Sequence, residues 1–228
     1  MINTFKFIVL AVIISLTTAC ATQSNLLSKQ EAYPVMYDED INSIVVVPAI
    51  NHSTAADAPI LYQTSVAEPL AYMGHYVMPI EVTTELLHEQ GVSDGEQLVD
   101  VPPQKFGDLF GADAVLFVTI DKWDTNYYVV GGNVTVGLHY VLRSTATGAQ
   151  LWNYHSEQVV DTSDNSGNGL LVALIATAIK TANQDYLPIA KRVNNIAIST
   201  LPYGKYHPQS GKDGALKVVP VNSIAADH

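Results

Sequence analysis

Two histidines in the second half of the chain could act together if a hairpin brings them close. His139 and His155 flank a turn signal at residues 146–148 and lie in strand-like, alternating segments. Pairing through that turn places the two imidazoles opposite each other, about 5 Å apart at Cβ. Imidazoles at that distance could clamp a metal ion or sense pH, and Glu157 lies on the same face. Because no third ligand is evident, a half-exposed polar strand face is favoured over this weak metal candidate.

Other residue types that perform catalysis lack the spacing that catalysis requires. Asp121 and Asp124 border Trp123, as in some glycan sites, but aspartates are common at strand ends and no second wall is evident. Gly131-Gly132 is predicted to form a two-residue hairpin turn, and it lacks the Lys-Ser/Thr that completes a phosphate loop. The string at 165–169 follows a polar loop, whereas a nucleophile elbow follows a buried strand. The sequence therefore predicts no catalytic residues, no cofactor and no enzyme, with a hydrolase as the least favoured function.

The single cysteine, Cys20, excludes an internal disulfide and a cysteine-based zinc site. It follows an apolar run at residues 7–16, which has the length of a signal-peptide core. Such a run is well short of the roughly 20 residues that span a bilayer. The position of the cysteine just after the run therefore suggests a processed and anchored N-terminus.

The residues around Cys20 resemble the lipobox of bacterial lipoproteins. Small residues, Thr18 and Ala19, come before the cysteine. The resemblance implies a signal peptide at 1–19 and acyl chains, including palmitate, on Cys20. Ala21 stands where aspartate would retain a lipoprotein in the inner membrane, so the resemblance also implies the outer membrane. An ordinary secretory signal with an incidental cysteine is the alternative.

The composition excludes further classes of protein. The chain has 228 residues and a formal net charge of −11, which becomes −12 when the signal peptide and its Lys6 are removed. An acidic surface is unsuited to nucleic acid, so no nucleic-acid partner is expected. With 48% hydrophobic and 14% charged residues, the chain can bury a core. The length suits one domain with tails.

Residue patterns predict a single α/β (α+β) domain at 41–202, with helices packed on a mixed sheet. The predicted order is β-α-β-α-α-β-β-β-α-α, with parallel pairing first and an antiparallel meander later. A lipidated N-terminus and tether is expected at 20–40 and a flexible tail at 203–228. Predicted strands cover 43–50, 75–82, 114–128, 134–143 and the segment after 148, and predicted helices cover 61–73, 83–90, 104–110, 169–182 and 185–200.

The turn at 146–148 also fixes a register for its hairpin. Gly148 suits the left-handed position of a three-residue loop. That loop pairs Leu142 with Trp152 and Tyr140 with Tyr154. The same pairing gathers the apolar and aromatic residues on one face, so turn and alternation predict the same hairpin independently.

Two segments could contact a partner or ligand. The loop after the first strand carries Asn51 and Ser53 among small polar residues. Trp123, Tyr127 and Tyr128 lie toward the far end of a hairpin, where exposed aromatic side chains favour interaction. The alternative for these aromatic residues is that they cover the sheet edge.

Several strings occur in a specific order along most of the mature chain. They lie at 44–48 with 51–54, 68–70 with 74–79, 110–116, 147–148 with 151–152, and 201–208. Together they resemble a family of bacterial lipoproteins of unknown function. The element order is similar to the periplasmic domain of the curli-secretion channel lipoprotein, the N-terminal domain of the Tol periplasmic protein, and a lipoprotein activator of a cell-wall synthase. The family supplies no catalytic residues.

The resemblance and the residues together favour a non-enzymatic outer-membrane lipoprotein whose domain lies in the periplasm. It would dock onto an envelope complex for secretion or cell-wall synthesis, held to the lipid bilayer through Cys20. Oligomerisation stays open, but without long membrane hairpins the chain is not expected to form a pore alone. The alternative is a periplasmic module that binds a cell-wall fragment or small molecule.

Overall fold

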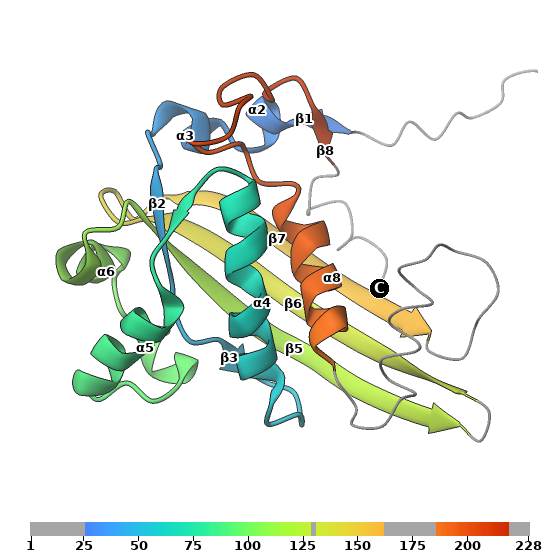
Figure 1. Cartoon of the computed structure of the whole chain (residues 1–228). Helices are drawn as coiled ribbons and strands as arrows, with labels where there is room; N and C mark the ends of the chain where they lie inside the picture. Colours follow the sequence, from blue (N-terminus) through green and yellow to red (C-terminus); the bar gives the residue numbers. More distant parts are fainter. Residues whose placement is uncertain (1–25, 129–130, 162–185, 219–228) are drawn as a thin grey trace, which may run out of the picture.

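The computed structural model describes residues 26–128, 131–161 and 186–218, which build a six-stranded mixed sheet with helices on both faces and a separate two-stranded sheet (Figure 1). Helices α4 (Ala58–Tyr72) and α8 (Leu187–Ile198) pack together and cover one face. Helices α5 (Ile80–Glu89) and α6 (Pro103–Phe110) contribute to a smaller core on the other face, at the parallel part of the sheet. The predicted α/β domain is therefore confirmed.

The strand order β4–β2–β5–β6–β7 changes direction part-way across the sheet. β4 (Tyr76–Val77), β2 (Ser43–Val46) and β5 (Ala114–Tyr128) pair in parallel, because helical connections return the chain to the same edge. β6 (Gly131–Ser144) and β7 (Gln150–Asp161) continue antiparallel through hairpins. The predicted parallel part followed by a meander is thus confirmed.

β2 is buried on both faces, as its β-branched run predicts. Ile44 and Val46 join the larger core with α4 and α8, whereas Val45 and Val47 join the smaller core with α5 and α6. The chain then resumes its pairing with β5 as the short β3 (Ile50–Asn51). This central position fixes the loop that follows β3 beside β5.

The β6–β7 hairpin has the predicted register. Leu142 lies opposite Trp152, and Tyr140 lies opposite Tyr154. Gly148 has the predicted left-handed conformation, with a φ of 76°. The apolar residues of β6 at alternating positions 134 to 142 are all buried. Side-chain alternation was therefore sufficient for the pairing of these residues. The turn itself is longer than the predicted three-residue loop, because β6 ends at Ser144, β7 begins at Gln150 and the register shifts between Leu142 and Arg143.

Some predicted boundaries are wrong. Gly131 and Gly132 lie within β6, opposite Tyr128 and Tyr127, and so do not form the turn. The strand expected at 75–82 is only β4, because α5 begins at Ile80 directly after Pro79.

Two further predictions concern the segments at 92–101 and 169–182. The polar connection at 92–101 contains a short 3-10 helix, η1 (Gly95–Leu98). The helix expected at 169–182 lies outside the described residues. Within the described ranges, no helix is long and apolar enough to cross a membrane.

The largest difference from expectation is at the two ends of the described chain. Residues 26–40 and 203–218, expected as parts of a tether and a flexible tail, pack together at one end of the sheet (Figure 1). We call these two segments the terminal cap. In it, β1 (Leu27–Ser28) pairs antiparallel with β8 (Lys217–Val218), and α2 (Lys29–Ala32) and α3 (Pro34–Asp38) follow β1.

A buried ion pair joins the two segments of the terminal cap. The side chain of Lys29 is 4% exposed, and its Nζ lies 3.5 Å from Oδ2 of Asp213, which is also buried. The same ammonium donates hydrogen bonds to the carbonyl oxygens of Leu201 (2.6 Å) and Ser199 (3.2 Å). Removing either charge would leave the other buried without its partner, so the ion pair holds the two chain segments together.

Candidate functional site

The face of β5, β6 and β7 that points away from α4 and α8 is only partly covered. We call it the open face. Its rows run from Phe117 through Val141 to Asn153 and from Thr119 through His139 to His155. All of these side chains are half-buried or exposed, whereas their immediate neighbours in the strands are mostly buried. Strand alternation therefore places two very different surfaces on the same strands.

Three histidines and two carboxylates meet on the open face. The rings of His139 and His155 lie edge to face with centroids 5.7 Å apart, in the predicted pairing. Asp121 reaches both sides of the group, because Oδ2 lies 3.8 Å from Nδ1 of His155 and Oδ1 lies 3.8 Å from Nδ1 of His52. Nε2 of His52 in turn lies 3.3 Å from Oε1 of Glu96. We call these five residues the histidine cluster.

Burial and neighbouring charges both shift the pKa of His139 in the histidine cluster. Partial burial lowers the pKa of His139, the neighbouring His155 lowers it further, and the carboxylate of Asp121 opposes both effects. Glu157, which shares this face, is occupied by Lys122 at 2.8 Å. No group of three or more histidine, cysteine or acidic side chains within the described residues is placed to hold a metal ion. The metal role of the His139–His155 pair thus gains no support from the geometry.

The sequence could not have assembled this cluster beyond its histidine pair. His52 follows β3, Glu96 lies in η1, and Asp121 lies at a β-bulge between Ile120 and Lys122. These residues meet because β3 pairs in parallel with β5, a contact between distant segments. The only sequence signal was that His52 and Asp121 each follow a continuous apolar run, at 43–50 and 114–120.

The predicted contact residues Asn51 and Ser53 shape the loop that carries His52. Oδ1 of Asn51 accepts hydrogen bonds from the Ser53 amide (3.1 Å) and hydroxyl (2.7 Å). Nδ2 of Asn51 donates to the carbonyl of Ala55 at 2.9 Å. Both side chains thus bond within their own loop and position its backbone.

Trp123 does not offer the exposed contact surface that the sequence suggested. Only 2% of its surface is exposed, and it belongs to the larger core. The bulge between Ile120 and Lys122 adds a residue to β5, so the odd-numbered position 123 turns inward. Tyr127 and Tyr128 end β5, and their side chains lie outside the described part of the chain.

An apolar groove runs along the open face beside α6. It has a volume of about 210 Å³. Phe117 forms part of its wall and packs edge to face on Phe106 of α6, with ring centroids 5.5 Å apart. Arg143 is the only charged residue of the lining and forms no salt bridge with any described residue. The remaining lining residues are Ile50, Val99, Val101, Pro103 and Val141.

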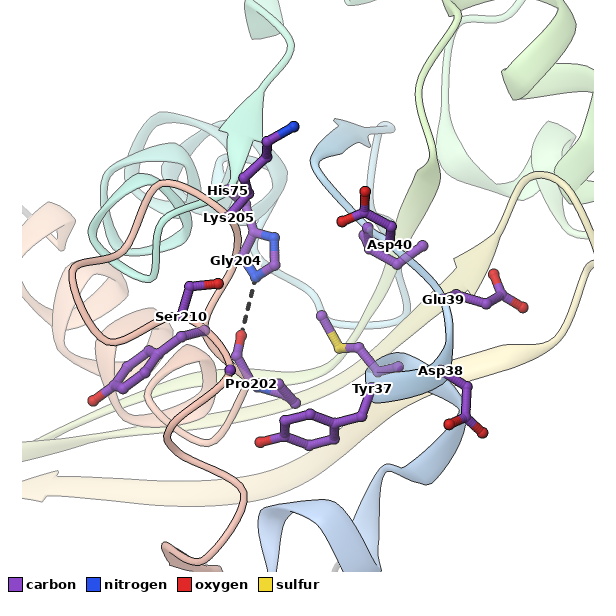
Figure 2. A pocket seen from close by; sticks show the side chains of 13 residues that line it. Tyr37, Asp38, Glu39, Asp40, His75, Pro202, Gly204, Lys205 and Ser210 are labelled. Atoms are coloured by element: carbon purple, nitrogen blue, oxygen red, sulfur yellow. Dashed lines mark hydrogen bonds between the residues drawn. The ribbon is translucent and has the colours of Figure 1, made fainter.

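A second cavity, of about 300 Å³, lies in the terminal cap, between residues 36–41 and 202–211 (Figure 2). His75 enters it from the start of β4 and is 4% exposed. Its Nε2 is 3.1 Å from the Pro202 carbonyl, so this nitrogen carries a proton and donates. Nδ1 is buried without a hydrogen-bond partner. Burial lowers the pKa of His75, which favours a neutral ring.

Charged groups surround this cavity without forming a catalytic set. Asp38, Glu39 and Asp40 follow one wall and Lys205 lies on the opposite one (Figure 2). The hydroxyl of Thr147 donates to Glu39, so that carboxylate is held outside the cavity. Burial raises the pKa of Tyr37, and nearby Asp213 raises it further. The cavity offers polar atoms for recognition and no arrangement of nucleophile and base.

Comparison with known proteins identifies the family. A family model described as "Putative lipoprotein GNA1162-like" matches residues 32–206. The chain belongs to this family. The match includes most of the sheet and both partners of the histidine pair. It confirms the lipoprotein family expected from the sequence strings.

A curated sequence and a crystal structure, both from Neisseria meningitidis, agree with this GNA1162-like assignment. The lipoprotein NMB1124/NMB1162 of serogroup B strain MC58 is 33% identical over 137 residues, which are 60% of this chain and 63% of the relative. The match thus spans less than two thirds of that relative. The crystal structure of lipoprotein GNA1162 is 29% identical, covers 60% of this chain and 94% of its own, and has a TM-score of 0.52. A PelC dodecamer structure from Paraburkholderia phytofirmans is 17% identical, with coverage of 69% and 89% and a TM-score of 0.39.

Proposed function

We propose that this GNA1162-like chain is an outer-membrane lipoprotein that docks a protein of the cell envelope and performs no catalysis. Its anchor would be acyl chains, including palmitate, on Cys20, with the domain in the periplasm. The family assignment supports a lipoprotein, and the position of the single cysteine supports the site. Two or more acyl chains hold a protein durably on a bilayer, whereas one is marginal.

The observation that carries the docking function is the apolar groove on the open face. An uncovered sheet face beside an apolar groove suits a protein partner, because burying apolar surface drives association. Arg143 gives the partner a defined chemistry: an apolar side chain flanked by a carboxylate. A guanidinium binds a carboxylate with two parallel hydrogen bonds, which fixes orientation as well as affinity. The histidine cluster borders the same surface and would tune its charge.

Photocrosslinking in the native membrane tests the docking function. A benzophenone amino acid at Val141 should yield one prominent adduct, and Arg143→Glu should remove it while Arg143→Lys retains part of it. The matched control is the same probe at Tyr72, which is exposed on α4, on the covered side of the sheet. Equal adducts from both positions, or none from Val141 and Val99, would reject docking in the groove.

Labelling with palmitate tests the anchor. The native chain should incorporate the label, and Cys20→Ser should not. Density-gradient separation of membranes should place the native chain in the outer membrane and Ala21→Asp in the inner membrane. Equal labelling of Cys20→Ser would refute the anchor, and an inner-membrane native chain would refute the assignment to the outer membrane.

The terminal-cap cavity supports a second candidate, a module that binds a small cell-wall fragment. The unpartnered Nδ1 of buried His75 and the hydroxyl of Tyr37 are the observations that favour it. Soluble cell-wall fragments should then raise the melting temperature of the native domain, and Tyr37→Phe should reduce the rise. A native domain that saturating fragments leave unchanged would reject this function.

A further inference from the structure

Three leucines of the terminal cap are exposed next to the proposed anchor. Leu26, Leu27 and Leu216 have 41%, 36% and 47% of their surface exposed. Leu27 and Leu216 lie side by side, because Leu27 pairs with Val218 and the amide of Lys29 donates to the carbonyl of Leu216 at 2.8 Å, and Leu26 directly precedes Leu27. Leu27 and Leu216 are therefore diagonal neighbours across the two strands. We call the three side chains the leucine edge.

The leucine edge belongs to a well-connected part of the fold. The side-chain oxygen of Ser28 caps α2, and the Glu31 carboxylate accepts from the Ser28 amide at 2.8 Å, which completes a capping box. Lys29, the next residue, is tied to Asp213 by the buried ion pair. Val218, opposite Leu27, is buried in the larger core. The strand pairing, the capping box and the ion pair thus hold the backbone around Leu27 and Leu216 in place.

The covalent chain keeps this edge close to any anchor on Cys20. Only residues 21–25 separate Cys20 from Leu26. A fully extended chain spans at most about 3.5 Å per residue, so Leu26 can lie no more than roughly 20 Å from the anchored residue. Apolar side chains of peripheral proteins enter a bilayer to about 5–10 Å. The edge is therefore within reach of the bilayer surface that would hold the acyl chains.

We propose that the leucine edge inserts into the outer part of the bilayer and so determines the orientation of the domain relative to the membrane. This inference rests on the proposed lipid anchor. The occupant is a phospholipid surface, because the exposed Lys217 beside Leu216 can extend its ammonium to the phosphates while its methylenes stay apolar. The attraction is mainly apolar, since the mature chain carries a strong excess of acidic residues. The edge lies in the terminal cap, while the long β5–β6 hairpin ends at the opposite end of the sheet (Figure 1).

Quenching by brominated lipids tests the insertion. The acylated chain with Leu216→Trp is reconstituted into phosphatidylethanolamine–phosphatidylglycerol vesicles with bromines near the headgroup end of the acyl chains. The matched control is Val159→Trp, at a 63% exposed position of β7 on the open face. The native chain supplies the background from the buried Trp123 and Trp152. We expect roughly half of the added Leu216→Trp emission to be quenched, with a shift to shorter wavelength, and the Val159→Trp emission to stay unchanged.

Each other outcome counts against a specific statement. Vesicle flotation of both variants, with Leu216→Trp unquenched, would overturn the insertion and leave the anchor intact. Equal quenching at both positions, or quenching only at Val159→Trp, would overturn the proposed orientation. Failure of the native chain to float would refute the anchor, and the insertion with it. Thermal melting of each variant confirms that the tryptophan was introduced into a folded domain.

Discussion

The two faces of the β5–β6–β7 sheet use the same strands for opposite purposes. On the covered face, Tyr140 and Trp152 are almost fully buried beneath α4 and α8. On the open face, their neighbours in sequence, Val141 and Asn153, are half-buried and meet no helix of the larger core. A single step along the strand therefore separates residues that hold the fold from residues free to recognise a partner.

The covered face is held by aromatic packing and by one buried polar network. The ring of Tyr140 packs edge to face on Tyr62 at 6.3 Å and lies 5.9 Å from that of Trp152. Its hydroxyl donates to Oδ1 of Asn194 at 2.6 Å, and Nδ2 of Asn194 donates to Oγ of Ser65 at 2.8 Å. Strand, α4 and α8 are thereby connected through one asparagine. Among the described residues, the ion pairs of the open face are instead accessible to solvent.

The largest expected effect is the loss of an indole from the covered face. Trp152→Ala should lower the free energy of unfolding by about 3–5 kcal/mol, because it leaves a large cavity in the core. It also removes the hydrogen bond from Nε1 to the Thr200 hydroxyl, at 3.0 Å. Urea denaturation measures the loss, with Asn153→Ala as the control on the adjacent open-face position. If the two variants were equally destabilised, the faces would not differ as described.

A smaller effect is expected when only the polar network is cut. Tyr140→Phe keeps the ring but leaves Oδ1 of Asn194 buried without its donor, which should cost about 1–3 kcal/mol. The open-face counterpart is Thr119→Val, whose half-buried hydroxyl lies outside this network and should change stability little. Paired chemical denaturation curves give both values. A neutral Tyr140→Phe would mean that packing alone holds the covered face.

The contrast between the faces could be predicted from sequence, because it depends on local signals. The turn at 146–148 and the alternation of β6 fixed which residues lie together, and His139 meets His155 as expected. The burial of Trp123 could not be predicted, because one bulge in β5 turned its side chain toward the other face of the sheet. A bulge leaves no mark in a simple alternation pattern, so the aromatic residue was assigned to the wrong surface.

The terminal cap could not be predicted for a different reason. Its segments are largely polar, and their few buried residues include the charged Lys29 and Asp213, so they do not form an apolar stripe. Their order comes from partners far away in the sequence, above all the pair of Lys29 and Asp213. The histidine cluster has the same origin, since His52 reaches Asp121 only through parallel pairing of β3 with β5. From composition alone such segments are interpreted as linkers, because composition carries no information about long-range contacts.

Acidification should weaken the fold modestly through the open face. Burial, and secondarily His155, lower the pKa of His139 from its usual 6.5, while Asp121 opposes them. The unfolded chain therefore binds this proton more tightly, and stability falls as the pH drops from 6.5 toward the lower folded-state pKa. Stability measured across this range should depend less on pH in His139→Gln. Part of the dependence should persist, because burial also lowers the pKa of His75. If the pH dependence of stability were the same in His139→Gln, the pKa of His139 would not differ between the folded and unfolded chain.

The smallest expected effect is at the ion pair on the open face. Lys122 and Glu157 are 2.8 Å apart and both are about half exposed, so water screens their attraction. Lys122→Met should leave the urea midpoint within error, and the exchanged pair Lys122→Glu with Glu157→Lys should do the same. This separates the pair from the buried network, whose members have no water to replace a lost partner. A loss in Lys122→Met as large as that in Tyr140→Phe would show that the open face also holds the fold. Its side chains would then not be free to serve a partner, and the docking proposal would lose the surface on which it rests.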